Sequence, residues 1–389
     1  MNKILVTGIT GLVGSAFVAA LLKERSDYEI VCLVRSGGGK SAEERVVSII
    51  RDECAFDGYP EVADAILPKI QVIEGDVATI VPEELVKNEK LNGVNIIFHC
   101  AADVNLGKDP TGKVFRINYE GTRNMVELAK LLNVKEFHYV GTAYVAGKLC
   151  GTAYEAAPID NGFNNPYEES KFKGEYLVRE SGIPFSVYRP AIITGRRSDG
   201  RIRKPLAFYR ILEFLGKVKS HRCSKLGLNP EEFVDMQINF ATVPSQHVYF
   251  VPIDYVQEAI TALFQLPVTN TGYHITGDSP VTTRQIEDSI SKILRLDGVS
   301  VGENNGNDGN SEGSSLMTRF VGDLFPYFSS DIVFDQTNVR KALGDKILDW
   351  EYGTKGLETL IKSFYQDYFP NVEWLQKVIS GEPERLPRR

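Results

Sequence analysis

The chain has 389 residues, of which 43% are hydrophobic and 24% are charged. These values are typical of a soluble globular protein with one large domain or two closely joined ones. No apolar run reaches the roughly 20 residues that a membrane span needs, so we expect no integral membrane segment. The formal net charge of −7 argues against nucleic acid as a partner.

Short apolar runs alternate with helical stretches over the first half of the chain. Helices are expected over 12–25 and 116–132 and from Pro166 onward. The expected strands cover 3–8, 29–35, 70–76, 94–102, 136–142 and 185–195. Strands that are apolar throughout and separated by helices indicate a parallel sheet with both faces covered. We therefore predict an α/β fold with a doubly wound (Rossmann) parallel sheet.

The pattern changes after Gly195. A strand and then a helix from near Asp254 are expected within 247–260, and an amphipathic helix ends the chain. Residues 302–315, GENNGNDGNSEGSS, predict a mobile loop. We expect a dinucleotide-binding domain over 1–198 plus 247–275. A smaller, mostly helical substrate-binding domain is expected over 199–246 plus 276–389.

The composition also bears on the cellular compartment. Five scattered cysteines without a C-x-x-C pair favour a reducing cytoplasm over a disulfide framework or a metal site. The start, MNKILVTGITGLVG, indicates a buried strand and no signal peptide.

The segment TGITGLVG (7–14) predicts a dinucleotide site, because its glycines follow a strand and open a helix. Gly8 permits the tight turn, Gly11 lets the backbone approach a pyrophosphate, and Gly14 lets helix and strand pack closely. The helix N-terminus supplies N–H donors for the phosphates. A glycine turn without a ligand is the alternative.

The second expected strand ends at Arg35. An acidic residue there would bind the ribose of NAD, whereas an arginine can bind a 2′-phosphate and favours NADPH. Ser36 and Arg45 could assist, and Asp76 could accept from the adenine amino group. A solvated strand end and a plain turn aspartate are the alternatives. We also assign to the cofactor site Thr10, Leu12, Val13, Val77, Ala101, Ala102, Pro190 and Ile192.

The stretch NPYEESKFKGEY (165–176) carries Tyr167 and Lys171 four residues apart, so both lie on one helix face. The helix follows a strand that ends at Thr142, and its first turn can face the carboxyl edge of the sheet. A nearby ammonium lowers the pKa of a tyrosine, and a threonine hydroxyl can polarise a carbonyl. A second match, Tyr144 with Lys148, is interpreted as chance because Gly147 weakens any helix between them.

These motifs resemble those of an extended short-chain dehydrogenase/reductase. Three further segments fit the same family: NYEGT (118–122), YRPAIITG (188–195) and FDQTNVRKALG (334–344). The resemblance implies that Thr142, Tyr167 and Lys171 are catalytic, that Tyr167 and Lys171 also contact the cofactor, and that Asn118 supports a proton relay.

Further phrases resemble the thioester-reductase and fatty acyl-CoA reductase-like branch of that family. They are CLVRS (32–36), FHCAADVNL (98–106), GTAYVAG (141–147) and FVPIDYVQEAI (250–260). The branch implies NADPH-dependent reduction of an acyl thioester, held on coenzyme A or on an acyl or peptidyl carrier protein, to an aldehyde or on to an alcohol. Gly141 departs from the serine that often precedes the catalytic threonine in this family.

Residues 201–225 hold eight Lys or Arg and one acidic residue. This run predicts either a site for an anionic partner or a solvated helix face. The apolar residues Phe208, Ile211, Leu212 and Leu215 recur at helical spacing and could line an acyl tunnel or pack in a core.

Three other functions remain open at this point. A nucleotide-sugar epimerase or dehydratase on the same scaffold would retain NAD, against which Arg35 speaks. A simple carbonyl reductase would use the same residues on another substrate. A non-enzymatic NADP sensor would not need Thr142, Tyr167 and Lys171 together.

Overall fold

The computed structural model describes residues 2–240, 246–301, 312–348 and 350–381. Contacts between Cα atoms divide the chain into two compact units, each described here by itself. Unit 1 contains residues 1–191, 255–276 and 333–347, and unit 2 contains 192–254, 277–332 and 348–389. Within the described ranges, no helix is both long and apolar enough to cross a membrane.

Unit 1 is built on a seven-stranded sheet in which every neighbouring pair is parallel. The spatial order β12-β7-β5-β4-β1-β2-β3 confirms the doubly wound topology predicted from the sequence. The strands are β1 (Asn2–Thr7), β2 (Tyr28–Val34), β3 (Ile70–Glu74), β4 (Val94–His99), β5 (Glu136–Val140), β7 (Phe185–Pro190) and β12 (Thr271–Ile275).

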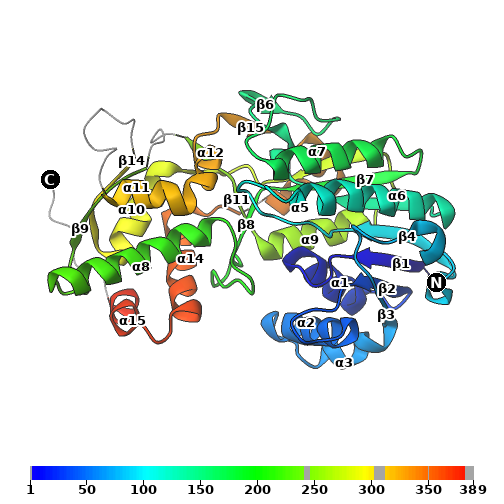
Figure 1. Cartoon of the computed structure of the whole chain (residues 1–389), viewed down its shortest axis with the longest axis horizontal. Coiled ribbons are helices and arrows are strands. Elements are labelled where there is room, and N and C mark those ends of the chain that lie inside the picture. The colour runs from blue at the N-terminus through cyan, green and yellow to red at the C-terminus, as the bar shows by residue number, and fades with distance from the viewer. Residues whose placement is uncertain (1, 241–245, 302–311, 349, 382–389) are drawn as a thin grey trace. The chain divides into compact units, whose positions relative to one another are not determined.

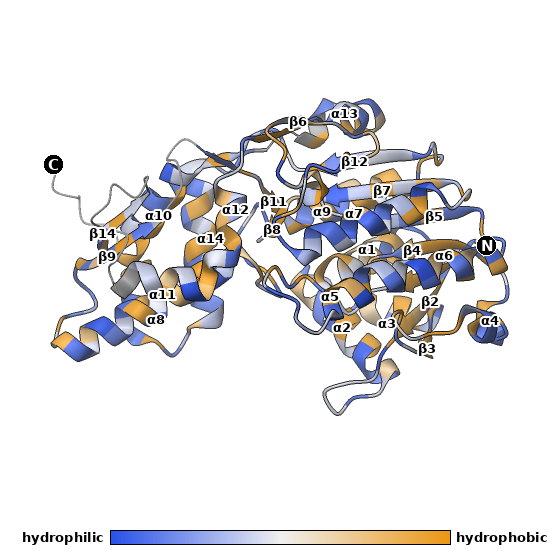
Figure 2. Ribbon diagram, turned by 45° about the horizontal axis from the view of Figure 1, so that its top comes forward, coloured by the Kyte–Doolittle hydropathy of each residue, from blue (hydrophilic) through white to orange (hydrophobic). Residues whose placement is uncertain are grey.

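Helices cover both faces of this sheet. One face carries α1 (Leu12–Glu24), α2 (Ala42–Phe56) and α9 (Ile253–Phe264), and the other carries α5 (Lys113–Phe115), α6 (Gly121–Leu131) and α7 (Pro166–Arg179) (Figure 1). On the α1 face, the Phe17 and Phe98 rings stack with centroids 3.8 Å apart, and Phe264 meets Phe17 edge-on. Burial of this apolar surface is what holds the layers together. Figure 2 shows hydrophobic residues along β4, between helices that also carry hydrophilic ones.

Short elements complete unit 1. They are α3 (Val62–Ile66), α4 (Pro82–Leu85), β6 (Gly151–Ala153), β15 (Ile332–Phe334) and α13 (Thr337–Leu343). β15 pairs with β6, and the Asn338 side chain at the start of α13 donates to the carbonyl of Gly272 in β12 at 3.0 Å. These contacts explain why 333–347 group with the sheet, although the sequence analysis had placed them in the C-terminal part.

Two expected elements are interrupted. The helix expected over 116–132 contains a π-helical turn at Arg116–Glu120, in which the Asn118 carbonyl accepts from the Thr122 hydroxyl at 2.6 Å. The strand expected over 185–195 ends at Pro190, which has no N–H for a ladder. After it the chain forms the separate strand β8 (Ile192–Thr194), which pairs with β11 in unit 2.

Unit 2 is the smaller and is mostly helical. Its strands are β8, β9 (Val234–Phe240), β10 (His247–Val248), β11 (Phe250–Pro252), β13 (Val281–Thr282) and β14 (Leu296–Val301). Its helices are α8 (Phe208–Leu226), α10 (Thr283–Leu294), α11 (Glu312–Val321), α12 (Phe325–Phe328), α14 (Gly353–Tyr368) and α15 (Glu373–Ser380). Of the expected mobile loop at 302–315, residues 302–311 lie outside the described residues, and the last four begin α11.

Because β1, β4, β5 and β7 are parallel, their carboxyl ends meet at one edge of the sheet. The segments that leave this edge start after Thr7, His99, Val140 and Pro190. They carry most of the residues that the sequence analysis assigned to the cofactor and the catalytic group.

Candidate active site

The turn after β1 is shaped by its glycines. Gly8 has a φ of +79°, and a Cβ there would lie 2.5 Å from the Cys100 carbonyl carbon. A Cβ on Gly14 would lie 2.3 Å from the Gly8 oxygen, so α1 can pack on the turn only with glycine there. Gly11 is the N-cap of α1, and its N–H donates to the Gly8 carbonyl at 2.9 Å.

This turn fits the pyrophosphate of a dinucleotide. No side chain caps α1, and no acidic residue stands in its first turn, which contains Leu12 and Val13. The positive end of the helix is therefore presented by backbone groups at the turn that holds Thr10. A pyrophosphate is the kind of group that such an end stabilises.

Two predicted adenosine contacts meet at the carboxyl ends of β2 and β3. The Arg35 guanidinium pairs with the Asp76 carboxylate at 3.1 Å, and the Arg45 guanidinium donates to the Arg35 carbonyl. The Arg35 side chain is 54% exposed, and Ser36 beside it is exposed. An exposed ion pair contributes little stability, so Arg35 can exchange Asp76 for a phosphate at small cost.

The other assigned cofactor residues take different positions. Val77 is buried, and its side chain would contact a Cβ on Gly121, so it packs in the core. The Ala101 N–H donates to the Thr7 hydroxyl at 3.2 Å, while Ala102 is exposed. Pro190 ends β7 and Ile192 opens β8 in unit 2. Their contact with a cofactor stays a prediction.

A neutral histidine, His99, connects Thr7 at the end of β1 with Thr122 in α6. His99 is buried, and burial lowers its pKa to about 3. Its Nδ1 lies 2.6 Å from the Thr7 hydroxyl, and its Nε2 lies 3.0 Å from the Thr122 hydroxyl. The sequence analysis did not assign a role to His99, because nothing in the run FHCAA shows what the imidazole contacts.

The helix α7 begins as the sequence suggested. The Asn165 side chain accepts the Glu168 N–H at 3.0 Å, and Pro166 occupies the first turn. Tyr167 is half-buried and Lys171 is buried one turn later. The second Y-x-x-x-K pair has no such helix, because Gly147 has a φ of +60° and ends a short 3₁₀ turn that carries Tyr144.

Thr142 and Tyr167 meet at the carboxyl end of β5. The buried Thr142 hydroxyl accepts the Tyr144 N–H at 3.3 Å and donates to the Pro190 carbonyl at 3.5 Å. Burial raises the pKa of Tyr167 to about 12, and the nearby Thr142 hydroxyl acts in the opposite direction. The phenol is therefore protonated at neutral pH, which is the form that can donate a proton.

Lys171 lies behind this pair. Its Nζ donates to the Val140 carbonyl at 2.8 Å. Burial lowers the pKa of Lys171 to about 8, against the opposing effects of Cys100 and Glu175. The sequence analysis expected the ammonium to lower the pKa of Tyr167; burial dominates instead, and Lys171 is not among the groups that shift this pKa.

Asn118 connects two parts of the site. Its side-chain oxygen accepts the Asp103 N–H at 2.8 Å, and its Nδ2 donates to the Asp103 carbonyl and to the Ser170 hydroxyl, each at 3.0 Å. Ser170 stands between Tyr167 and Lys171, so Asn118 fixes the segment after β4 against α7. Asp103 and Ser170 were not assigned from the sequence, since both are common turn and helix residues.

Three of the eight basic residues in the run 201–225 form ion pairs with described residues of unit 2. Arg201 pairs with Asp367 at 2.9 Å, and Arg210 pairs with Asp323 at 2.6 Å. Lys217 pairs with Glu213 at 2.5 Å. The residues considered for an acyl tunnel, Phe208, Ile211, Leu212 and Leu215, are all buried in the core. Among the described residues, no group of His, Cys, Asp and Glu is arranged to hold a metal ion.

Comparison with known proteins identifies a family. The profile of the family described as male sterility protein matches residues 6–260. The chain is 26% identical over 378 residues to the nonribosomal peptide synthetase asaC of Aspergillus flavus, covering 89% of this chain and 34% of that protein. It is 28% identical over 286 residues to a carboxylic acid reductase of Segniliparus rugosus, covering 68% and 23%. The chain thus spans about a quarter to a third of the curated relatives it matches.

Solved structures share the fold. The terminal R domain from the myxalamid PKS-NRPS biosynthetic pathway aligns with a TM-score of 0.72 at 22% identity, covering 95% of this chain and 92% of that one. The thiolation-reductase di-domain from an archaeal non-ribosomal peptide synthetase gives 0.72 at 22%, covering 96% and 76%. A UDP-glucuronic acid 4-epimerase from Bacillus cereus in complex with NAD gives 0.59 at 20%, covering 96% and 99%.

Proposed function

The chain belongs to the male sterility protein family, in the thioester-reductase branch of the extended short-chain dehydrogenases/reductases, and we propose that it reduces an acyl thioester to an aldehyde with NADPH. The acyl group would be carried by coenzyme A or by a carrier protein. The names of a carboxylic acid reductase, of peptide synthetases and of a thiolation-reductase di-domain among its relatives support this substrate class.

The observation that carries the proposal is the position of the buried Thr142 hydroxyl at the carboxyl end of β5, near enough to the Tyr167 phenol to lower its pKa. Two hydroxyls at one point can both bind the oxygen of a thioester carbonyl. The negative charge on that oxygen grows as the carbon is reduced, so both hydrogen bonds strengthen in the transition state.

In the proposed reaction, a thioester takes up two electrons and two protons and becomes an aldehyde and a thiol. NADPH supplies the hydride, which adds to the thioester carbon. The phenol of Tyr167 donates its proton to the resulting oxyanion, and a hemithioacetal forms. When the carbon–sulfur bond breaks, the hemithioacetal hydroxyl returns its proton to Tyr167, and the thiolate leaves and takes a proton from solvent. A second NADPH would reduce the aldehyde to the alcohol through the same residues.

Lys171 serves the cofactor side of this proposal. An ammonium has three N–H donors, and one of them is directed at the Val140 carbonyl. The others can bind the hydroxyls of the nicotinamide ribose.

The preference for NADPH rests on Arg35 and Arg45 at the end of β2. Arg35→Ala should weaken NADPH binding about 10- to 100-fold, the effect of losing hydrogen bonds to a charged group, and should leave NADH binding unchanged. Titration of both cofactors by nicotinamide fluorescence measures this. Equal losses for the two cofactors would contradict the 2′-phosphate contact.

The central experiment measures NADPH oxidation against acyl-coenzyme A and acyl-carrier thioesters, with identification of the aldehyde, alcohol and thiol. Tyr167→Phe should lower kcat by about 10²–10⁴-fold, the usual contribution of a general acid. Thr142→Val should lower it by about 10²–10³-fold. Tyr144→Phe is the matched control, because it alters the tyrosine of the other Y-x-x-x-K pair, and it should keep wild-type activity.

Other outcomes would favour other functions. Reduction of simple ketones or aldehydes without any thioester reduction would identify a carbonyl reductase. Tightly bound NAD in the purified protein, with turnover of a nucleotide sugar, would identify an epimerase or dehydratase. A wild-type phenotype for Tyr167→Phe would favour a non-enzymatic NADP sensor.

A further inference from the structure

The side chain of Lys171 packs mainly against β5. Its Nζ donates to the Val140 carbonyl at 2.8 Å and lies 4.1 Å from the centroid of the Tyr139 ring. Consecutive residues of one strand thus supply a carbonyl and an aromatic face. A cation over the face of a buried ring is stabilised by the ring's quadrupole, more strongly when water is excluded.

Tyr139 can take this position because α7 has a glycine opposite it. Tyr139 is fully buried. A Cβ on Gly174 would lie 2.7 Å from the Tyr139 hydroxyl oxygen and 3.3 Å from the Thr122 hydroxyl oxygen. Any side chain at 174 would therefore push the ring away from the helix that carries Lys171.

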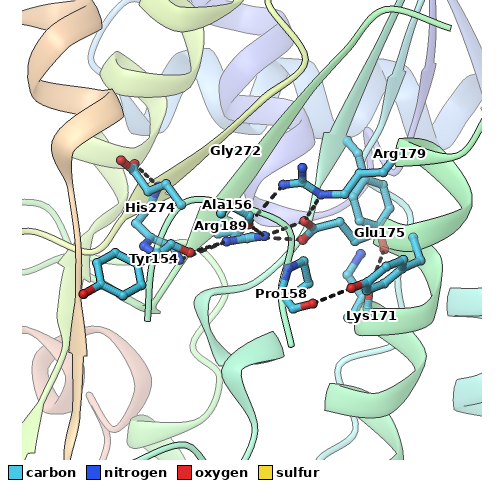
Figure 3. Close-up of polar contacts among 12 residues, drawn as sticks. Tyr154, Ala156, Pro158, Lys171, Glu175, Arg179, Arg189, Gly272 and His274 are labelled. Carbon is cyan, nitrogen blue, oxygen red and sulfur yellow. Dashed lines mark hydrogen bonds and ion pairs between the residues drawn. The ribbon is translucent and has the colours of Figure 1, made fainter. Parts of the chain in front are cut away.

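Glu175 provides a fixed negative charge one helical turn after Lys171. The carboxylate is fully buried and accepts from the Arg189 guanidinium at 2.9 Å and 2.5 Å and from Arg179 at 2.7 Å (Figure 3). Arg189 in turn donates to the Ala156 carbonyl at 2.7 Å. Rotation of the carboxylate would break a buried ion pair, so its negative charge is fixed at this position of α7.

The other titratable groups around Lys171 are neutral near pH 7. Burial raises the pKa of the Cys100 thiol to about 11 and lowers the pKa of His99 to about 3. Burial raises the pKa of Tyr167 to about 12 and that of Tyr139 well above its ordinary value. Among the described groups that shift the pKa of Lys171, Glu175 is thus the one that is charged at neutral pH.

We propose that Tyr139 and Glu175 are positioning residues that keep the Lys171 side chain charged and aimed at the cofactor side of the sheet edge. This inference rests on the proposed function, in which the Lys171 ammonium binds the nicotinamide ribose. Without these two partners, a lysine buried this deeply would lose its proton near neutral pH, and its amine would have fewer N–H donors for the ribose hydroxyls.

The test is the titration of Lys171 itself in the ligand-free protein, followed by NMR with ¹³C at the lysine Cε and assigned with Lys171→Met. Tyr139→Leu should lower the titration midpoint of Lys171 by about one pH unit, which corresponds to about 1.4 kcal/mol. Tyr139→Phe keeps the ring and removes only the hydroxyl, so its midpoint should remain at the wild-type value. Glu175→Gln should also lower the midpoint.

Tyr188→Leu is the matched control. Tyr188 is a fully buried tyrosine of the neighbouring strand β7, and its hydroxyl lies 2.8 Å from His138 Nδ1, with no contact to Lys171 among the described interactions. It should destabilise the fold as Tyr139→Leu does and leave the Lys171 midpoint unchanged. If Glu175→Gln does not fold, the midpoints of Tyr139→Leu, Tyr139→Phe and Tyr188→Leu alone decide whether the proposal holds.

An unchanged or raised midpoint in folded Tyr139→Leu would overturn the proposal, as would equal shifts in Tyr139→Leu and Tyr188→Leu. The readout needs neither cofactor nor substrate. A protein that titrates as expected but reduces no thioester would contradict the proposed function alone. A protein that reduces thioesters with an unshifted midpoint in Tyr139→Leu would contradict the positioning role alone. In the active enzyme, the alkaline limb of kcat should move with the NMR midpoint.

Discussion

Two buried lysines, one in each unit, have similar surroundings but differ in how many of their N–H donors the protein uses. Lys171 is 1% exposed and Lys219 is fully buried. Burial lowers the pKa of each to about 8. Each ammonium also faces an aromatic ring, Tyr139 at 4.1 Å and Trp374 at 4.9 Å. A low pKa and burial therefore do not separate a functional lysine from a structural one.

The difference lies in the donors that remain. Lys219 donates to the carbonyls of Glu232, Leu294 and Arg295 at 3.0, 2.7 and 3.1 Å, which uses all three N–H groups of an ammonium. In the described structure Lys171 donates only to the Val140 carbonyl, and its neighbour on the same helix face is Tyr167. Lys219 is satisfied by the fold of unit 2, whereas Lys171 keeps donors for a ligand.

Lys171→Met should show the largest effect. Methionine keeps the apolar stem and removes both the charge and the remaining donors. We expect kcat to fall about a hundredfold or more and NADPH binding to weaken, because the nicotinamide ribose loses the N–H donors that would orient it beside Tyr167. The free energy of unfolding should change by only about 1 kcal/mol, since losing one hydrogen bond is offset by no longer burying a charge.

Steady-state kinetics and urea denaturation of the same preparation check both parts. If Lys171→Met lost several kcal/mol of stability and kept its kcat, Lys171 would be structural like Lys219, and the comparison would fail.

Lys219→Met should instead lower the stability and leave the activity unchanged. It leaves three carbonyls without their donor, at the end of α10 and beside β9, and their combined cost exceeds the gain from no longer burying a charge. We therefore expect a net loss of about 3 kcal/mol in the free energy of unfolding. The kcat of the folded fraction should equal that of the wild type. Denaturation followed by tryptophan fluorescence suits this test, because Trp374 lies against the Lys219 ammonium. A stability equal to the wild type would show that water replaces the lysine.

The sheet could be predicted from the sequence because strand formation depends on local composition. Apolar runs and intervening helices indicated a parallel, doubly wound sheet, which the structure confirms. The ends of elements were less accurate. The strand expected to reach residue 102 ends at His99, because the chain must turn where Gly8 packs against Cys100.

The site was predictable only where its geometry is local. Tyr167 and Lys171 share a face because any helix places residues four apart together. Tyr139 could not be assigned, because its contact with Lys171 depends on how closely α7 approaches β5, which Gly174 permits. The buried position of Lys219 could not be predicted either. In the sequence it belongs to a basic run that suggests an exposed surface, whereas in the structure its side chain is buried in the core of unit 2.

The smallest predicted effect is the change of the free energy of unfolding with pH. Lys219 has a folded pKa of about 8, below the unfolded value of 10.5. Between these two values the unfolded chain binds more protons than the folded one, so this lysine makes the free energy of unfolding rise with pH. The slope is at most about 1.4 kcal/mol per pH unit.

The stability advantage of the wild type over Lys219→Met should therefore grow between about pH 8 and pH 10 and stay constant below pH 7. Denaturation of both proteins at each pH measures the difference and cancels the contribution of every other titrating group. Lys171→Met should show the same trend, because the comparison assigns the two lysines the same desolvation and different uses for their donors. A difference that is flat across this range for Lys219 and rising for Lys171 would mean that the three carbonyls hold Lys219 in its charged form.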